Sequence, residues 1–249
     1  MKESHLFYAP DVAQTSALPD DEAAHAVRVL RMKEGDALWV TDGCGTFYDA
    51  TITMATPKRC TLSITAERSW QRPWQAAIHL CVAPTKNMER VEWLAEKATE
   101  IGIDGLHLID CANSERRVVK TERVERILVS AMKQSHKALL PTLTPMTRFA
   151  DFIKQPFEGQ RFIAHCYAQG DISDRPKPFL FDVLRPDAAA LVMVGPEGDF
   201  TIDEVRAAEA QGFVSVSLGE SRLRTETAGL VAAYQMNLKF SIGASVKAH

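Results

Sequence analysis

The sequence predicts a small β-rich domain over residues 1–72, followed by a larger α/β domain over residues 73–249 with a mainly parallel sheet and helices on both faces. Before residue 72, short runs of alternating apolar and polar residues are separated by turn-forming residues. After Pro73, strand-like apolar runs alternate with helical periods, which is the pattern of a parallel sheet. The chain of 249 residues is long enough for two such domains.

In the N-terminal part the spacing predicts three strands joined by hairpin turns, and one helix. The strands are expected at Ala37–Thr41, Phe47–Met54 and Cys60–Ala66, and the helix at Asp20–Leu30. The turn at 42–45 contains two glycines, and the turn at 56–59 contains a proline, as hairpin connections commonly do.

In the C-terminal part five apolar runs predict strands, and four stretches of helical periodicity predict the helices between them. The strands are expected at Ala76–Ala83, Gly105–Ile109, Arg161–Tyr167, Ala188–Val194 and Val214–Leu218. The helices are expected at Asn87–Ile101, Thr121–Leu139, from Thr201 onward, and Thr227–Phe240. Thr201 and Glu204 have the spacing of a capping box, so the loop before them should be fixed against a helix start.

Composition excludes several classes of protein. The chain is 46% apolar with a formal net charge of −3, which is typical of a soluble globular protein. Its five cysteines are scattered and lack any C-x-x-C spacing, so we expect neither a disulfide framework nor a metal site. Neither a signal peptide nor an apolar stretch of about 20 residues is evident, so a cytoplasmic location is expected. His165 lies within a predicted strand and is expected to be a core residue with satisfied hydrogen bonds rather than a ligand.

Two polar loops predict a ligand site. The run Leu191–Val194 is followed by the loop Gly195–Phe200, and the run Val214–Leu218 is followed by the loop Gly219–Ala228. Ligands of parallel sheets bind beyond the carboxyl ends of the strands, so these loops are expected to form one site. The chain has neither a phosphate-binding P-loop nor a G-x-G-x-x-G turn after a strand, which argues against nucleoside triphosphates and dinucleotides.

These loops resemble the paired knot motifs of the trefoil-knotted RNA methyltransferases known as SPOUT. Segments upstream are similar to the branch that methylates N3 of a uridine in 16S ribosomal RNA. The upstream similarity rests on Lys86, Met88, Glu89, Lys97, Ala98, Thr99, Glu100 and Gly102, and on Ser114, Arg116, Arg123, Gln134, Ser135 and Pro141. The N-terminal third resembles that branch's small PUA-like RNA-binding domain through His25, Val29, Leu30, Arg31, Gly35, Asp36, Asp42, Gly43 and Tyr48.

The resemblance implies a trefoil knot, S-adenosyl-L-methionine as cofactor, and a specific uridine of 16S rRNA in the small ribosomal subunit as acceptor. It also implies a homodimer, because such enzymes typically complete their site across a two-fold interface. The expected cofactor-binding residues are Val194, Gly195, Pro196, Glu197, Gly198, Leu218, Gly219, Leu223, Arg224, Thr225, Glu226, Thr227 and Ala228. For any single glycine among them, ordinary turn chemistry is the alternative.

RNA contacts are expected on basic side chains of both domains. The segment 112–137 contains seven basic and three acidic residues, and this local excess of positive charge suits phosphate binding. The alternative for this segment is a solvated helix face with ion pairs. The RNA-binding candidates are His25, Arg28, Arg31, Lys86, Arg90, Arg116, Arg123 and Gln134. The first three have a second interpretation as a charged turn that complements a helix dipole.

Arg224 is the catalytic candidate. The acceptor N3 of uridine is a weakly acidic imide, so catalysis needs alignment and a group that stabilises charge on the flanking carbonyl oxygens. The alternative for Arg224 is an ion pair with Glu226 that braces the loop. Glu197 has three interpretations: its carboxylate accepts a hydrogen bond from the amino group of the donor, it accepts the uridine proton if its pKa is raised, or it holds N–H groups of the loop and never meets substrate. We do not assign it as the base.

The chain departs from the usual pattern of the branch at several positions of these loops. The branch usually has Leu-Gly-Pro-Arg-Ile-Leu-Arg where residues 218–224 of this chain read Leu-Gly-Glu-Ser-Arg-Leu-Arg. Ser221 thus stands in place of an arginine, and an arginine, Arg222, follows it. Asp199 replaces a usual glycine. Two alternative functions remain open: methylation of a ribose 2′-hydroxyl or a transfer RNA base, and donor binding without turnover in ribosome assembly.

Overall fold

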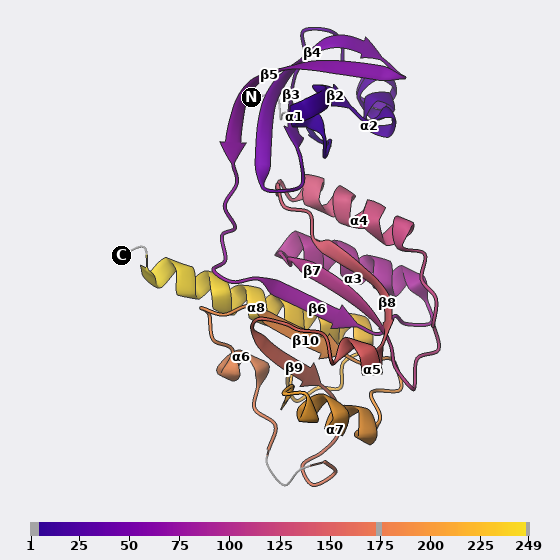
Figure 1. Cartoon of the computed structure of the whole chain (residues 1–249), viewed down its shortest axis with the longest axis vertical. Coiled ribbons are helices and arrows are strands. Elements are labelled where there is room, and N and C mark those ends of the chain that lie inside the picture. Colours follow the sequence, from indigo (N-terminus) through magenta and orange to yellow (C-terminus); the bar gives the residue numbers. More distant parts are fainter. Residues whose placement is uncertain (1–4, 173–175, 248–249) are drawn as a thin grey trace. The chain divides into compact units, whose positions relative to one another are not determined.

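The computed structural model describes residues 5–172 and 176–247, with side chains up to residue 242. The chain divides into two compact units (Figure 1). The first comprises Met1–Gln71 and Val129–Leu140, and the second comprises Arg72–Leu128 and Pro141–His249. The sequence suggested two continuous domains, 1–72 and 73–249. In the structure, residues 129–140 group with the first unit although they lie within the second of these segments.

The first unit is built on a five-stranded sheet with the order β1-β3-β4-β5-β2. Its elements are β1 (Leu6–Tyr8), α1 (Val12–Thr15), β2 (Ala17–Leu18), α2 (Asp20–Ala24), a π-helical segment (His25–Val29), β3 (Ala37–Thr41), β4 (Thr46–Thr56) and β5 (Arg59–Ser69). β1 pairs with β3 in parallel, and the other neighbours are antiparallel. The hairpins predicted from the sequence are therefore confirmed; β3 has the predicted bounds, and β4 and β5 are longer than expected.

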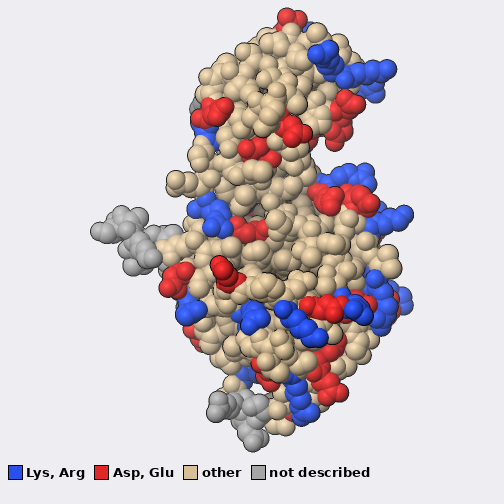
Figure 2. Space-filling view, viewed as in Figure 1, with Lys and Arg blue, Asp and Glu red and all other residues tan. Residues whose placement is uncertain are grey.

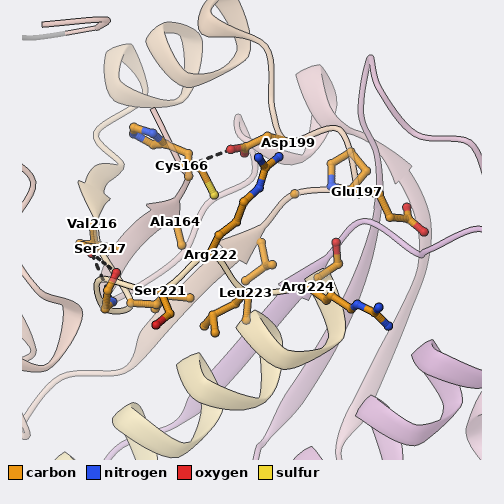
Figure 3. A pocket seen from close by; sticks show the side chains of 18 of the residues that line it. Ala164, Cys166, Glu197, Asp199, Val216, Ser217, Ser221, Arg222, Leu223 and Arg224 are labelled. Atoms are coloured by element: carbon orange, nitrogen blue, oxygen red, sulfur yellow. Dashed lines mark hydrogen bonds between the residues drawn. The ribbon is translucent and has the colours of Figure 1, made fainter. Parts of the chain in front are cut away.

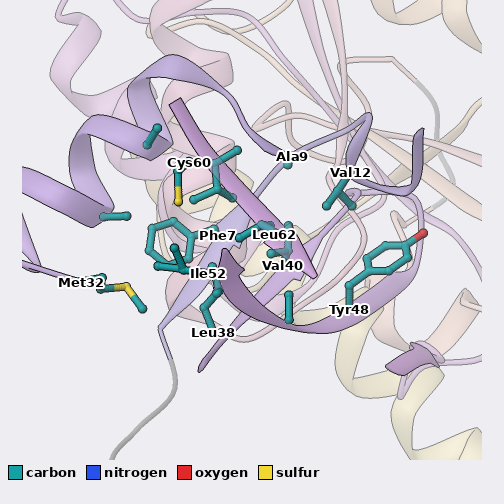
Figure 4. Packing of buried hydrophobic residues seen from close by; sticks show 14 residues of the cluster. Phe7, Ala9, Val12, Met32, Leu38, Val40, Tyr48, Ile52, Cys60 and Leu62 are labelled. Carbon is teal, nitrogen blue, oxygen red and sulfur yellow. The ribbon is translucent and has the colours of Figure 1, made fainter. Parts of the chain in front are cut away.

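One face of this sheet carries the core of the first unit (Figure 4). Leu38 and Val40 alternate along β3, and Ala50 and Ile52 alternate along β4, with all four side chains buried. Phe7 from β1 packs into the same cluster. The period of two in the sequence is thus the period of the buried face.

Residues 129–140 complete the first unit. They begin within α4 (Thr121–Gln134), which crosses the division between the units. Lys133 forms an ion pair with the buried Glu22. The carbonyl oxygen of Ala138 accepts hydrogen bonds from the Thr41 hydroxyl (3.3 Å) and from the Gly45 N–H (2.8 Å).

The second unit contains a six-stranded sheet with the order β11-β9-β10-β6-β7-β8, in which every neighbouring pair is parallel. Its strands are β6 (Ile78–Val82), β7 (Gly105–Asp110), β8 (Thr142–Arg148), β9 (Gln160–Ala164), β10 (Ala190–Val194) and β11 (Val214–Val216). Its helices, besides α4, are α3 (Met88–Ile101), α5 (Phe149–Phe152), α6 (Leu180–Val183), α7 (Ile202–Ala210) and α8 (Thr225–Lys247). The predicted α/β class is confirmed, and the trefoil stays a prediction from the resemblance.

Helices cover both faces of this sheet (Figure 1). Leu191 and Met193 of β10 pack in one cluster with apolar residues of α5 and α7. α8 packs on β6 and β10 and also contacts α3. Because all five residues of β10 are buried, this strand lies at the centre of the core, as its unbroken apolar sequence predicted.

Several predicted elements end earlier than the sequence suggested, and one strand was missed. The helix predicted to reach Leu139 ends at Gln134, because His136 adopts a left-handed φ of 51° and the Lys137 N–H donates to the Met132 carbonyl. The predicted strand Arg161–Tyr167 ends at Ala164. The strand β8 was missed, since Pro145 interrupts its pattern, and its place at the sheet edge tolerates that proline.

Asp104 is a buried hydrogen-bonding centre at the start of the second unit. Its carboxylate, whose side chain is 8% exposed, accepts from Arg72 Nη1 at 2.7 Å, from Trp74 Nε1 at 3.1 Å and from the Ile78 N–H at 2.8 Å. Three donors from the segment that enters β6 thus share one carboxylate. This arrangement anchors the first strand of the sheet to the loop before β7.

A pair of histidines lies side by side on β6 and β7. His79 Nδ1 is 3.0 Å from His107 Nε2, and His107 Nδ1 is 2.9 Å from the Thr144 hydroxyl. Burial, together with the neighbouring His79, lowers the pKa of His107 from 6.5 to about 4. Burial also lowers the pKa of His79.

The lowered pKa values of this pair make the free energy of unfolding depend on pH. In the unfolded chain the histidines take up protons below about pH 6.5, whereas folded His107 does so only near pH 4, so the free energy of unfolding falls as the pH falls through that window. We expect His107→Leu to flatten the fall by up to about 1.4 kcal/mol per pH unit. Urea unfolding at several pH values measures this slope. His5→Leu, at an exposed position, is the control, and an unchanged slope in His107→Leu would contradict the assignment.

No helix among residues 5–172 and 176–247 combines the length and the apolar character that crossing a bilayer requires.

Candidate functional site

A cavity of about 710 Å³ lies at the carboxyl ends of three neighbouring strands (Figure 3). In the sheet β9 lies between β10 and β11, so the loops after β10 and β11 flank the end of β9. Residues of both loops and of the end of β9 line the cavity. The two loops selected from the sequence thus meet at one site, at the position where parallel sheets bind ligands.

The cavity brings together most of the predicted cofactor-binding residues. Those that line it are Val194, Gly195, Pro196, Glu197, Leu218, Gly219, Leu223, Arg224, Thr225 and Ala228. Gly198, Glu226 and Thr227 do not belong to the lining. The first turn of α8 therefore contributes one face of its helix to the cavity.

The loop after β10 returns tightly on itself. A Cβ added to Gly195 would lie 3.1 Å from the backbone nitrogen of Phe200, closer than side chains normally approach. Phe200 is fully buried, and Thr201 and Glu204 form the complete capping box that the sequence predicted. The loop is thereby fixed at both of its ends, which keeps its backbone groups in place for a ligand.

Asp199 holds this loop in an unusual conformation. Its φ of 63° lies in the left-handed region, which L-residues other than Asn and Asp rarely occupy. The carboxylate accepts the Phe200 N–H through Oδ1 and the Cys166 N–H through Oδ2, both at 2.7 Å. The second of these bonds explains why the ladder of β9 ends before Cys166. Asn113 donates to the carbonyl oxygens of Gly198 and Asp199 and joins the loop after β7 to the same turn.

Glu197 acts as a support between loops. Its Oε1 accepts the Lys86 N–H at 3.0 Å. Arg116 donates from Nε to the Thr85 carbonyl at 3.2 Å and from Nη2 to the Lys86 carbonyl at 2.5 Å. Backbone groups of the loop after β6 are thus held from both sides. The geometry favours the interpretation in which Glu197 braces the loop.

The loop after β11 carries two arginines with different surroundings (Figure 3). Arg222 extends toward Asp199, and Arg224 extends away from it. Glu226, the partner suggested for Arg224 as an alternative, instead pairs with Arg90 of α3 at 3.3 Å. Within the described residues Arg224 makes no side-chain hydrogen bond or ion pair, and it is exposed at the cavity. Arg224 is thus available to a bound molecule.

Backbone groups of this loop are held by their neighbours. Gly219 has a φ of 141°, which a side chain would strain, and its N–H donates to the Ser217 hydroxyl at 3.2 Å. Gln235 of α8 donates to the Leu218 carbonyl at 3.2 Å. The loop therefore presents a defined set of backbone groups to the cavity.

His165, at the end of β9, differs from the expectation of a satisfied core residue. It is buried and lines the cavity, but its Nε2 has no hydrogen-bond partner among the described residues. Its Nδ1 lies 3.4 Å from Lys177 Nζ, and its carbonyl oxygen accepts from the same ammonium at 2.6 Å. Burial lowers the pKa of His165 to about 4, with a smaller effect from Lys177.

The predicted RNA-binding residues fall into three groups. His25, Arg28, Arg31 and Gln134 are exposed in the first unit. Arg116 and Arg123 are engaged by the protein, Arg116 by backbone carbonyls and Arg123 by Glu92. Lys86 and Arg90 pair with Glu115 and Glu226. These residues therefore do not form one cluster of free cations.

The basic segment 112–137 is neutralised in part by acids from outside it. Asp110, Glu92 and Glu22 each pair with one of its cations, namely Arg117, Arg123 and Lys133. On the face that Figure 2 shows, basic and acidic side chains are interspersed. The local excess counted from the sequence thus overstates the free positive charge.

Sequence reasoning missed Lys177, His165 and Cys166 as parts of the cavity wall. Extending the strand β9 to Tyr167 hid the fact that a third loop begins at His165. Lys177 lies between two prolines, far along the chain from either loop, and nothing in its neighbourhood marks it as a site residue.

Comparison with known proteins agrees with this architecture. The RNA methyltransferase domain family matches residues 72–237, and the RNA methyltransferase PUA domain matches residues 18–65. The chain belongs to the family of RNA methyltransferases.

Within that family the chain is similar to proteins named ribosomal RNA small subunit methyltransferase E. The protein of that name from Mycobacterium bovis is 30% identical over 237 residues, which cover 91% of this chain and 88% of that protein. A probable rRNA-methyltransferase from Porphyromonas gingivalis is 46% identical, with a TM-score of 0.88 over 96% of this chain and 99% of that one. The methyltransferase E from Neisseria gonorrhoeae, solved bound to S-adenosyl methionine, is 26% identical with a TM-score of 0.81, covering 95% of this chain and 98% of that one.

Proposed function

We propose that this protein transfers the methyl group of S-adenosylmethionine to N3 of a specific uridine in the 16S ribosomal RNA of the small ribosomal subunit. The observation that carries the proposal is the meeting of two fixed polar loops at one cavity beyond the ends of β9, β10 and β11. Relatives named ribosomal RNA small subunit methyltransferase E support the rRNA substrate, and one was solved with the donor bound. The choice of uridine N3 follows the resemblance of residues 84–102 and 114–141 to that branch.

The cavity suits a nucleoside without phosphates. Backbone N–H and C=O groups of the loops after β10 and β11 are available for the polar edge of an adenine, and Leu218 and Leu223 provide apolar contacts. The donor supplies an electrophilic methyl carbon on a sulfonium. We assign the binding of the donor to the loop residues Val194–Gly198, Leu218, Gly219 and Leu223–Ala228, with Arg224 contributing its backbone to this contact. Gly198, Glu226 and Thr227 would act by shaping the loops rather than by lining the cavity.

Arg224 is the residue that we assign to the chemistry. As the uridine N3 loses its proton and attacks, negative charge grows on the two flanking carbonyl oxygens, and a guanidinium stabilises this charge. Arg224 lines the cavity, is exposed, and has no ion pair within the described part of the chain. We do not assign Glu197 as the proton acceptor, because its carboxylate already accepts the Lys86 N–H.

RNA binding is assigned mainly to the exposed basic residues His25, Arg28 and Arg31 in the first unit, together with Gln134. Lys86, Arg90 and Arg123 remain candidates whose ion pairs would open or be shared on binding. Arg116 we reassign to holding the loop after β6. A homodimer is also part of the proposal, since α3 and α8 expose the large apolar side chains of Trp93 and Tyr234.

Transfer of a radiolabelled methyl group tests this function. Isolated small subunits from a strain lacking the gene should accept label from S-adenosylmethionine, and mass spectrometry of the digested RNA should find N3-methyluridine. A ribose methyl group, or label in transfer RNA alone, would contradict the acceptor. If the protein binds the donor but incorporates no label into either isolated small subunits or naked 16S rRNA, it is a binding protein without turnover.

A further inference from the structure

His165 and Lys177 form a polar pair in the cavity wall that the proposed reaction does not yet use. His165 directly follows β9, and only 9% of its surface is exposed. Lys177 Nζ donates to the His165 carbonyl at 2.6 Å and lies 3.4 Å from His165 Nδ1. Both residues line the same cavity as the loops after β10 and β11.

The contact with Lys177 determines which nitrogen of His165 carries the hydrogen. An ammonium group has only donors, so the Nδ1 that faces it must be the acceptor. In the neutral imidazole the hydrogen then resides on Nε2. Nε2 is buried and has no acceptor among the described residues. A buried N–H without a partner is costly and rare, and it marks a place where a ligand atom is expected.

Lys177 is also incompletely satisfied. No carboxylate within the described part of the chain lies at ion-pair distance from its ammonium group. Asp199 is near enough to influence it, but both Asp199 oxygens already accept backbone N–H groups. Burial lowers the pKa of Lys177, as expected for a cation that lacks an adjacent counter-charge.

We propose that His165 and Lys177 form a subsite that binds the α-carboxylate of the methyl donor, with His165 Nε2–H and Lys177 Nζ as the hydrogen-bond donors. This inference rests on the proposed function. The carboxylate is the only anionic group of S-adenosylmethionine, and it sits at the end of a flexible chain that can reach a recessed site. A phosphodiester between two riboses is too bulky to reach a histidine of which 9% is exposed.

Binding of the demethylated product tests the subsite without turnover. We expect Lys177→Met to weaken binding of S-adenosylhomocysteine on the order of 10- to 100-fold in calorimetry, the usual range for one charge-assisted hydrogen bond. Decarboxylated S-adenosylhomocysteine, which keeps the amine and lacks only the carboxylate, should bind to the variant as well as to the wild type. Lys177→Arg should recover part of the lost affinity, and Lys154→Met, at an exposed position away from the cavity, should change neither ligand.

Three outcomes would overturn the subsite. They are equal weakening of both ligands by Lys177→Met, unchanged affinity for S-adenosylhomocysteine, and weakened RNA binding with intact donor binding, which would place a phosphate there instead. Failure of the wild-type protein to bind S-adenosylhomocysteine counts against the proposed function. Binding by the wild type that Lys177→Met leaves unchanged counts against the subsite alone.

Discussion

Replacing Arg224 with alanine is expected to lower the turnover of methyl transfer by on the order of 100-fold at saturating donor and RNA. The guanidinium lies at the cavity and has no ion pair within residues 5–172 and 176–247, so its removal should leave the loop intact. The loss should therefore appear in kcat, while the affinity for S-adenosylhomocysteine changes little. Initial rates of methyl incorporation into small subunits, with calorimetry of the product, measure both quantities.

Two further arginine variants serve as a control and a comparison for Arg224→Ala. Arg206→Ala removes an exposed arginine of α7 outside the cavity and should keep full turnover. Arg222→Ala removes the neighbouring arginine that extends toward Asp199 (Figure 3). Near-normal turnover in Arg224→Ala would reject the assignment, and a collapse in Arg222→Ala alone would transfer the role to that side chain.

Replacing Asp104 with alanine is expected to lower the free energy of unfolding by about 3–5 kcal/mol. The substitution leaves the Arg72 guanidinium, the Trp74 N–H and the Ile78 N–H without their shared acceptor in a part of the protein where the carboxylate is 8% exposed. Urea denaturation followed by circular dichroism measures this change. Asp104→Asn keeps one carbonyl oxygen and should lose less.

The comparison for Asp104 is Asp151, which pairs with Arg148 at the surface, where the two side chains are 49% and 80% exposed. Asp151→Ala should cost less than about 1 kcal/mol, because solvent screens an exposed pair and its side chains lose entropy on pairing. Equal effects of the two substitutions would show that Asp104 has no special role in anchoring β6.

The sequence predicted the strands of both sheets where a strong local pattern exists. The period of two in β3 and β4 and the unbroken apolar run of β10 identify a half-buried and a fully buried strand. The helix start at Thr201 was predicted correctly, because a capping box depends on two residues only three positions apart, here Thr201 and Glu204. Among the elements that were missed, β2 and α5 are two and four residues long and too short to show a period, and the longer β8 is interrupted by Pro145.

The cavity was only half predictable, for a physical reason. The loops after β10 and β11 can be predicted from the sequence, because glycines and charged residues follow directly on the two strands. Lys177 reaches the cavity only through the fold, because its hydrogen-bond partner in the wall, the His165 carbonyl, is twelve positions away in the sequence. Asp199 could be noted as a departure, but its bond to the Cys166 N–H depends on β9 and β10 being neighbours. Interactions between distant segments leave no local pattern in the sequence.

The return of residues 129–140 to the N-terminal unit limits how this protein can be taken apart. Severing the chain at residue 72 would remove Lys133 from Glu22, a carboxylate that is 7% exposed, and Ala138 from the turn that joins β3 to β4. A fragment ending there would carry a stranded negative charge inside it. Residues 1–71 therefore cannot be exchanged between proteins as an independent domain, and a truncated or chimeric protein must also contain residues 129–140.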